Sequence, residues 1–436
     1  MGISQRDVDS AVTEVGHRLL GTRDKFQKKF DEFLSTSFGK RKSLGFGQSP
    51  LLFPLVAVSL KEYLEKETEI LEVTNYLWYF SLPELSGVEV DYGKRIEVIS
   101  DGYYFIHYRD LPFVARMESC SYDYPESSKV TFFFNPEKEE VAKDLRAGLA
   151  DYFYKNNFYK GKKLLFTKED ENRAGALKFL DVEAWRDAEA VLPPGQSQAL
   201  FENSLGWLRR SGDLKRAGLP TRRGVILSGP PGVGKTVLFK QLCYQAEGIT
   251  CLFATGEALV ASTDIQMLYD LARMLRPTLV FLEDLDFVGG ERVSRLPVNR
   301  LLGGLLAELD GVKGNEEVVT LASTNFPEVI DKALADRPGR FDLKVELTYP
   351  GPEERRRMLA LFIGRIRDGI NPEVGGGEIA QLVKTTAGLS GAHLCEVVTH
   401  AASRCLFDKK PVLTLEDLQA SLRALKEGGK GKGIGF

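Results

Sequence analysis

The chain has 436 residues, of which 43% are hydrophobic and 27% charged, so it is expected to be globular and to form two or three domains rather than one. Its 58 basic and 61 acidic residues leave a formal net charge of -3, which argues against nucleic acid as the main partner. The five cysteines show no CxxC pair or other metal-ligand spacing, so we expect buried free thiols in a reducing, cytoplasmic compartment instead of zinc or redox chemistry.

The N-terminal region, residues 1–47, is polar and rich in charge. Its apolar residues recur at roughly helical spacing from Val15 to Leu34, which predicts a helical region. The glycine-rich segment 39–50 is expected to end it, and the basic cluster at 40–42 is typical of a solvated linker.

Residues 48–190 are predicted to form a mixed α/β domain, because β-branched and aromatic residues favour strands at 95–100, 103–108, 112–119 and 129–134. After these strands, Asn135 is expected as the N-cap and Pro136 as the first residue of a helix packed on them. The most apolar early stretch, 51–60, is shorter than the roughly 20 residues that span a bilayer, so no transmembrane segment is expected and we assign it to the core.

The second half of the chain changes character at the segment VLPPGQ, residues 191–196, which we take as a domain boundary. Residues 191–348 alternate apolar strands with helical segments, which indicates a parallel sheet with helices on both faces. The expected strands are 224–229, 249–255, 278–284, 318–323 and 343–348. Residues 349–426 show only helical patterns, at 352–366, 377–386, 391–405 and 414–426, and a flexible basic tail is expected at 427–436.

The segment GPPGVGKT, residues 229–236, lies between a predicted strand and a predicted helix, the context that makes a phosphate-binding loop a strong assignment. Its glycines allow successive backbone N–H groups to converge on phosphates, and the helix N-terminus adds positive charge. Lys235 is expected to reach the outer phosphates, and Thr236 to offer its hydroxyl to Mg²⁺.

Two acids, Glu283 and Asp284, end the predicted strand 278–284, which is the second strand after the phosphate-binding loop. They lie at the sheet edge where open α/β sheets bind ligands. Their order is unusual, because phosphate-loop enzymes commonly place first an aspartate that holds Mg²⁺ and ring-forming ATPases follow it with a glutamate that activates water. The order leaves two readings open: an enzyme with exchanged acids, or a nucleotide-binding domain that no longer hydrolyses. Asn325 ends a further strand, where its amide is suited to orient the attacking water or to sense the γ-phosphate.

Two arginines, Arg337 and Arg340, flank a proline-glycine turn soon after Asn325. Such arginines are usually surface residues. Their spacing after Asn325 nevertheless suggests that a guanidinium reaches the phosphates of a neighbouring subunit.

Six motifs in order, GPPGVGKT, the acidic strand end, NRLLGGLLAELDGV, LASTN, RPGRFD and GLSGAHL, make residues 195–426 resemble the AAA family of AAA+ ATPases. The resemblance implies a five-stranded parallel nucleotide-binding sheet, a helical lid, ATP and Mg²⁺ as ligands, and a hexameric or heptameric ring with ATP between subunits. It also implies that Asn325 is a sensor, that Arg337 and Arg340 act in trans, and that Gly391 and Ala392 face adenine. The nucleotide-binding residues it implies are Gly229, Pro230, Pro231, Gly232, Val233, Gly234, Lys235, Thr236 and Val237.

The segment before the phosphate loop is similar to the AAA branch of respiratory-chain assembly chaperones, whose acidic strand also ends Glu-Asp. Those proteins carry a transmembrane helix, which this sequence lacks. The loop after the second strand of the domain also differs from that of protein-threading members, because it offers only Leu259 and Val260 in place of an aromatic residue. Threading of an unfolded chain through a central pore is therefore not implied.

Exchanging aspartate and glutamate keeps the charge of a site and moves each carboxylate by roughly 1.5 Å, the scale at which geometry affects rates. Because Lys235, Thr236, Asn325 and both arginines are retained, we favour an active ATPase in which Glu283 holds Mg²⁺ and Asp284 activates water. The leading hypothesis is a ring that remodels or translocates a protein substrate or adaptor bound through residues 1–190. The alternative is a nucleotide-dependent assembly switch or scaffold with slow hydrolysis, and a nucleic-acid motor is the least supported.

Overall fold

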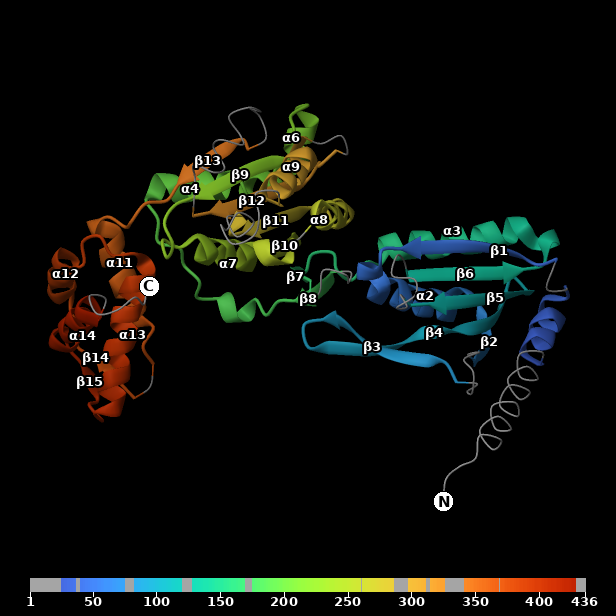
Figure 1. Cartoon of the computed structure of the whole chain (residues 1–436), viewed down its shortest axis with the longest axis horizontal. Helices are drawn as coiled ribbons and strands as arrows, with labels where there is room; N and C mark the ends of the chain where they lie inside the picture. Colours follow the sequence, from blue (N-terminus) through green and yellow to red (C-terminus); the bar gives the residue numbers. More distant parts are fainter. Residues whose placement is uncertain are drawn as a thin grey trace, which may run out of the picture. The chain divides into compact units, whose positions relative to one another are not determined.

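The computed structural model (Figure 1) divides into two compact units, residues 1–162 with 168–179, and residues 163–167 with 180–436. The first is called the N-terminal unit below and the second the C-terminal unit. The residues that the structure describes are 25–36, 40–74, 82–119, 128–168, 175–259, 261–285, 297–310, 314–325, 341–367 and 369–428.

The N-terminal unit contains a six-stranded antiparallel sheet in the order β1-β6-β5-β4-β2, with β3 also paired to β4. Its strands are β1 (Lys42–Gln48), β2 (Glu69–Thr74), β3 (Glu84–Asp91), β4 (Lys94–Tyr108), β5 (Leu111–Glu118) and β6 (Ser128–Phe134), and a short strand β8 (Ala176–Phe179) follows later in this unit. Helices α2 (Phe53–Glu67) and α3 (Glu139–Lys155) pack together on the sheet. The helical residues 25–34 pack on Phe105 and Val114 of the sheet through Phe30 and Leu34.

The helix predicted after β6 is confirmed at its start. Asn135 accepts a hydrogen bond through its side chain from the backbone N–H of Glu137, at 3.1 Å. The turn η2 (Pro136–Lys138) then leads into α3. The cap works as expected, because the first backbone N–H groups of a helix have no carbonyl acceptor within the helix and the Asn135 side chain accepts from one of them.

The glycine-rich segment 39–50 was expected only to end the helical region, and the structure shows that it contains strand β1. Lys42–Gln48 pairs along its length with β6, which supplies the partner that composition alone does not reveal. The basic cluster is also partly packed: the Arg41 guanidinium lies 4.4 Å from the Phe30 ring centroid and 5.6 Å from that of Phe133. Aromatic faces attract a guanidinium, so this arginine joins the helical residues 25–34 to the sheet.

The C-terminal unit contains a parallel sheet in the order β13-β9-β12-β11-β10-β7. Its strands are β9 (Arg223–Ser228), β10 (Thr250–Thr255), β11 (Thr278–Glu283), β12 (Val318–Thr324), β13 (Leu343–Glu346) and β7 (Lys163–Thr167). The five strands predicted from alternating apolar segments are confirmed. Their buried, nearly continuous apolar character follows from helices on both faces.

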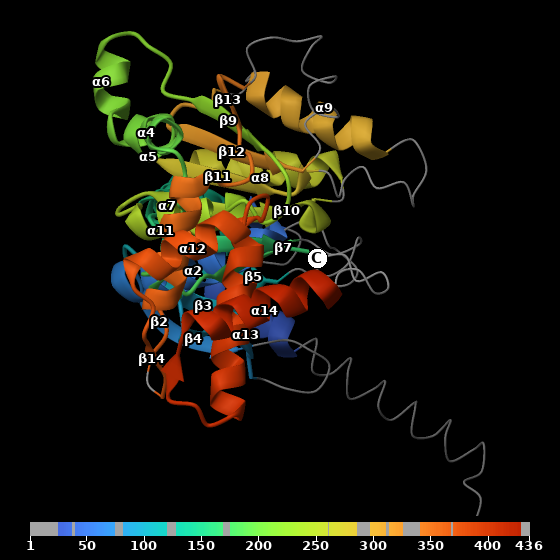
Figure 2. The same ribbon diagram turned by 90° about the vertical axis from the view of Figure 1, so that its left-hand side faces the viewer.

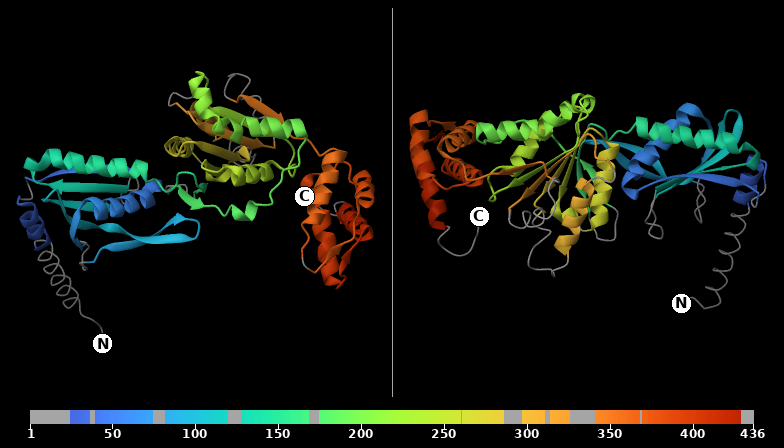
Figure 3. Two further views of the ribbon diagram at one scale, coloured as in Figure 1. Left: turned by 180° about the vertical axis from the view of Figure 1, so that it is seen from behind. Right: turned by 90° about the horizontal axis from the view of Figure 1, so that it is seen from above.

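Helices lie on both faces of this sheet (Figure 3). Helices α4 (Pro194–Glu202), α5 (Leu205–Arg209) and α7 (Lys235–Gln245) share one core cluster with the strands, where Phe239 of α7 stacks on Phe281 of β11 at 4.0 Å between centroids. Helices α8 (Ser262–Met274) and α9 (Pro297–Asp310) pack against each other, and α6 (Ser211–Arg216) precedes β9. Three-layer packing of this kind fixes the strand ends that carry the predicted site.

Strand β7 is a sixth strand of this sheet, although it lies within the range 48–190 that the sequence pattern assigns to the preceding domain. It pairs in parallel with β10, and Lys163 Nζ donates to the carbonyls of Ala246 and Ile249, both at 2.6 Å. The unit therefore begins before the expected boundary at 191. The proline pair used for that boundary instead starts α4, because proline suits the first turn of a helix.

Four helices follow the sheet and form the lid (Figure 2). They are α11 (Pro352–Gly364), α12 (Gly376–Thr385), α13 (Gly391–Phe407) and α14 (Leu415–Gly428), with a short parallel pair of β14 (Asn371–Pro372) and β15 (Val412–Leu413). All four were predicted from their apolar periodicity and share one core cluster. Among the described residues, no helix is both long and apolar enough to cross a membrane.

Candidate functional site

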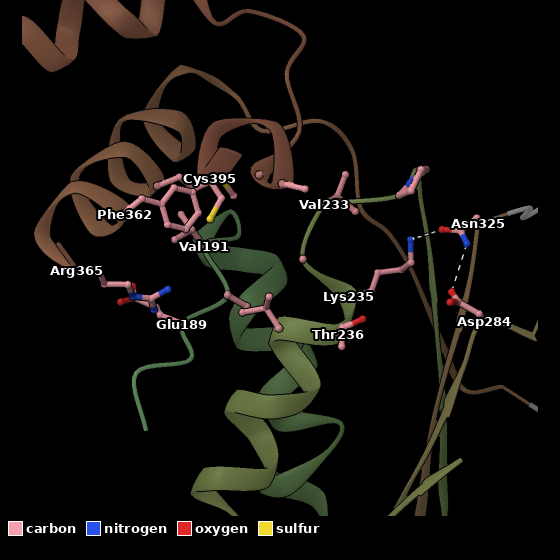
Figure 4. Close-up of a pocket in the computed structure, with 18 residues that line it drawn as sticks. Glu189, Val191, Val233, Lys235, Thr236, Asp284, Asn325, Phe362, Arg365 and Cys395 are labelled. Carbon is pink, nitrogen blue, oxygen red and sulfur yellow. Dashed lines mark hydrogen bonds between the residues drawn. The ribbon is translucent and has the colours of Figure 1, made fainter. Parts of the chain in front are cut away.

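A cavity of about 440 Å³ lies in the C-terminal unit, where the loop after β9, the ends of β11 and β12, and the lid meet (Figure 4). Three segments and two strand-end residues form its wall. They are residues 189–191, the loop 231–237, the lid residues Met358, Phe362, Arg365, Gly391, Ala392 and Cys395, and the strand-end residues Asp284 and Asn325. The predicted loop and strand ends therefore come together at one site.

The loop 229–236 adopts a conformation that requires glycine at three positions. Gly229, Gly232 and Gly234 have φ values of 147°, 77° and 107°, in the region that other residues rarely adopt. A Cβ at Gly229 would lie 2.1 Å from the carbonyl oxygen of Leu347, and one at Gly232 would lie 2.8 Å from Ala392 Cβ. Helix α7 begins at Lys235 directly after the loop, so its N-terminal N–H groups and positive dipole end lie at the cavity and suit an anion.

Lys235 links the loop to the end of β12. Its side chain is buried, with 7% of the residue exposed, and Nζ donates to the carbonyls of Gly229 at 2.7 Å and Pro230 at 3.1 Å and to Asn325 Oδ1 at 2.8 Å. Gly229 and Pro230, which were predicted to bind the nucleotide, thus meet the ammonium through their carbonyl oxygens. These three acceptors match the three N–H donors of an ammonium, so a phosphate oxygen in the cavity would be bound by replacing one of them.

The two acids at the end of β11 have different partners. The Thr236 hydroxyl donates to Glu283 Oε1, whereas Asn325 Nδ2 donates to Asp284 Oδ1 at 3.3 Å (Figure 4 shows the Asn325 bonds). Asp284 has a φ of 51°, and its backbone N–H donates to Ser323 Oγ at 3.2 Å. The left-handed conformation turns the chain immediately after the strand, so the adjacent carboxylates are directed to separate places.

The pKa of Glu283 is raised to about 7, first by burial of the carboxyl and then by the negative charge of Asp284. Lys240 and Lys235 oppose this shift without overcoming it. A carboxyl whose charge is disfavoured by burial and by a like charge is one that a divalent cation would bring back to the ionised form.

The lid wall carries the predicted residues Gly391 and Ala392. The backbone N–H of Ala392 donates to the Gly232 carbonyl at 3.1 Å, and a Cβ at Gly391 would lie 3.3 Å from the same oxygen. Ser390 caps the N-terminus of α13 by accepting from the N–H of His393. The start of α13 is thus held directly against the phosphate loop.

The residues at the end of the cavity opposite Asp284 and Asn325 were not predicted from the sequence. They are Glu189, Ala190, Val191, Met358, Phe362, Arg365 and Cys395. Met358 and Phe362 belong to the apolar side of a helix that packing already explained, and Ala190 and Val191 lie in an irregular segment before α4, so the sequence contained no signal that they also face a cavity. The predicted residues Arg337, Arg340 and Val260 lie outside the described residues.

The cavity fits a nucleotide bound with its phosphates at the loop and its base at the apolar end. The loop supplies backbone donors and an ammonium, and the far end supplies the Phe362 ring and the side chains of Val191 and Met358. Thr236 and Glu283, in direct contact, offer the oxygen ligands that Mg²⁺ prefers. The arrangement suits phosphoryl transfer to water, with Asp284 as the acceptor of its proton.

Comparison with known proteins agrees with this geometry. The sequence profile of the "ATPase family associated with various cellular activities (AAA)" matches residues 225–349. Human ATP-dependent zinc metalloprotease YME1L1 is 34% identical over 214 residues, which cover 46% of this chain and 26% of that protein. The proteasome-activating nucleotidase of Pyrococcus horikoshii is 32% identical over 215 residues, covering 47% of this chain and 52% of the relative. The chain therefore spans about a quarter to a half of the length of these two relatives.

Proposed function

We propose, from the match of residues 225–349 to the AAA ATPase family, that the protein hydrolyses ATP with Mg²⁺ and uses the reaction to remodel or translocate a protein substrate. The observation that carries the proposal is the contact chain from the phosphate loop through Lys235 to Asn325 and Asp284. These contacts join Lys235, which is suited to bind phosphate, to Asp284, which is suited to activate water. A degenerate site would have no reason to keep both ends of that chain.

Each residue in this series of contacts has a role in the proposed reaction. Lys235 binds the outer phosphates, and Thr236 and Glu283 hold Mg²⁺, which when bound neutralises phosphate charge. Asp284 accepts the proton of the attacking water. Asn325 donates to Asp284 and accepts from Lys235, so it fixes the acid relative to the phosphates.

The proposed assembly is a homo-oligomeric ring of six or seven subunits in which Arg337 and Arg340 reach the nucleotide of a neighbour. Support comes from their position after Asn325 in the sequence and from the AAA domain itself. A heterologous interface that closes into a ring would make hydrolysis depend on assembly.

We further propose that the protein is related to the respiratory-chain assembly chaperones and acts in the cytoplasm on a protein substrate or adaptor bound through residues 1–190, without threading it through a pore. Leu259, one of two residues that stand where threading proteins carry an aromatic residue, is only 2% exposed, so its side chain does not project to a substrate. This favours remodelling over threading. A nucleotide-dependent scaffold with slow hydrolysis is the second candidate, favoured by the same buried Leu259.

Mg²⁺ affinity should increase as the pH rises through about 7. The pKa of Glu283 is raised to about 7, so below that pH the folded protein holds the carboxyl protonated and Mg²⁺ must displace the proton. Well below pH 7, each further unit should weaken binding by about tenfold, with a plateau above about pH 8. Mg²⁺ titrations at fixed nucleotide across this range measure the effect, and a flat profile would contradict it.

The same shift has a consequence for the stability of the metal-free protein. Because the folded pKa lies above the ordinary value of 4.5, the stabilising contribution of Glu283 is complete below that value and is lost as the pH rises through about 7. Glu283→Gln should remove this part of the pH dependence of unfolding.

The proposed function is tested by ATP turnover measured with and without candidate protein partners. A remodelling enzyme should hydrolyse faster with its substrate, whereas a scaffold should show slow turnover that partners leave unchanged. The substrate is sought by affinity capture with a variant that binds ATP but cannot hydrolyse it, with the Lys235→Ala variant as the control for capture that does not require nucleotide. No turnover under any condition would refute the enzyme assignment.

A further inference from the structure

The segment 187–191 belongs to both halves of the C-terminal unit. Ala190 packs in the core cluster that contains the sheet, and the next residue, Val191, packs in the core cluster of the lid. The backbone N–H of Ala190 donates to Gln241 Oε1 of α7 at 2.9 Å. The segment is therefore fixed to the phosphate-loop helix on one side and enters the lid on the other, and its residues 189–191 also line the cavity.

Arg365, at the end of the first lid helix, holds this segment from the lid side. Its Nη2 donates to the backbone carbonyl of Asp187. A second, weaker contact joins Arg357 Nη2 to Glu189 Oε1 at 3.4 Å, with both side chains about half exposed. Both contacts are exposed, but Arg365 binds a backbone carbonyl at a fixed position, whereas the ion pair must hold two long side chains in place, so Arg365 is the stronger polar link of the two.

Arg365 also lines the cavity itself. Figure 4 shows Arg365 and Glu189 together at the end of the cavity opposite Asn325 and Asp284, where the nucleoside would lie. Among the described residues, the Arg365 Nε has no hydrogen-bond partner although it is buried. Buried donors are rarely left without an acceptor, so this N–H points to an acceptor that the described part of the chain does not provide.

We propose that Arg365 is a positioning residue for the nucleoside: it holds segment 187–191 as a wall of the cavity and donates through Nε to an acceptor on the ribose or base. The proposal rests on the nucleotide-binding function proposed above. It predicts that nucleoside binding and the ordering of segment 187–191 occur together, because the same guanidinium takes part in both. The nucleoside end of ATP is then held by Arg365 and segment 187–191, and the phosphates are bound independently by the loop.

The test compares Arg365→Ala and Arg365→Gln with Arg365→Lys and with Arg367→Ala. Arg367 is the matched control, because it is exposed two residues further along and its Nη1 bonds only to Gly364 O, at 2.9 Å, among the contacts that the described residues show. We expect the alanine and glutamine variants to raise the KM for ATP about tenfold with kcat within about twofold, the scale of one charged hydrogen bond. The lysine variant, which retains one charged donor, should recover much of the affinity, and Arg367→Ala should match the wild type.

Two further readouts separate positioning from general damage. Inhibition by tripolyphosphate, which has no nucleoside, should be as strong in Arg365→Ala as in the wild type. Hydrogen exchange at the amides of 187–191 should slow on ADP binding in the wild type but not in this variant. An unchanged KM, an equal effect of Arg367→Ala, or an equal loss of tripolyphosphate inhibition would overturn the proposal. If the wild-type protein does not bind ATP at all, its own binding measurement will show this before any variant is compared, and that result would refute the proposed function instead.

Discussion

Replacing Lys235 with alanine should reduce ATP turnover by at least about a hundredfold, the cost of removing one preorganised group that stabilises developing charge. Its ammonium is the group that contacts both the phosphate loop and Asn325, so the substitution removes a phosphate contact and also releases Asn325 from one of its partners. Nucleotide binding should weaken for the same reason. Turnover is measured at saturating Mg²⁺ and ATP.

The control is Lys215→Ala, because Lys215 is an exposed residue of α6 in the same unit and lies outside the cavity wall. It removes the same charge without touching the site and should hydrolyse ATP like the wild type. Unchanged turnover in Lys235→Ala, or an equal loss in Lys215→Ala, would refute the assignment of the site.

Lys235→Ala also serves to test catalysis across subunits. Arg340→Ala should bind ATP and hydrolyse it poorly, and mixing it with Lys235→Ala subunits should restore some activity where an intact arginine meets an intact cavity. If mixed rings form and no mixing ratio restores turnover, hydrolysis does not use a neighbour's arginine.

Much of the C-terminal unit could be predicted because its signals are local. The apolar strands at 278–284 and 318–323, the glycine pattern of 229–236 and the lid helices are each specified by a few neighbouring residues. Lys235, Glu283, Asp284 and Asn325 could be predicted to lie together for the same reason, since each is next to the end of such an element. Parallel strands bring their carboxyl ends to one edge, and that rule was sufficient to assemble them.

The parts that could not be predicted depend on partners distant in sequence. Strand β1 is glycine-rich and is stabilised by its pairing with β6, and β7 joins the sheet through β10 more than eighty residues later. The nucleoside end of the cavity combines residues 189–191 with Phe362 and Arg365, which local patterns explained as linker and helix packing. Strand propensity depends on the surrounding sheet, so sequence alone left these contacts open.

The left-handed conformation of Asp284 is the other feature that the sequence did not reveal. Its φ of 51° turns the chain at the strand end and separates the two carboxylates. As a result, the unusual Glu-Asp order need not place either acid where its counterpart would be in the common order. The roles have to be assigned from contacts, and these pair Glu283 with Thr236 and Asp284 with Asn325.

Asp284→Asn and Glu283→Gln should therefore fail in different ways. Asp284→Asn keeps the size of the side chain and loses the proton acceptor, so turnover should fall by about 10² to 10⁴ while Mg-ATP binds at near-normal affinity. It also removes the like charge that raises the pKa of Glu283, so its Mg²⁺ binding should extend to lower pH than in the wild type. Glu283→Gln removes charge beside the Thr236 hydroxyl and should raise the Mg²⁺ requirement by about tenfold or more.

A Mg²⁺ titration of both variants, followed by nucleotide binding and by turnover, separates the two assignments. With the roles proposed, excess Mg²⁺ should restore much of the turnover of Glu283→Gln and none of that of Asp284→Asn, because a cation can compensate for a weakened ligand but not for a missing proton acceptor. If Glu283 is instead the base and Asp284 holds the metal, the two responses exchange. The contact between Thr236 and Glu283 argues against the exchange, since a base bound to the metal-ligand hydroxyl would be held away from the attacking water.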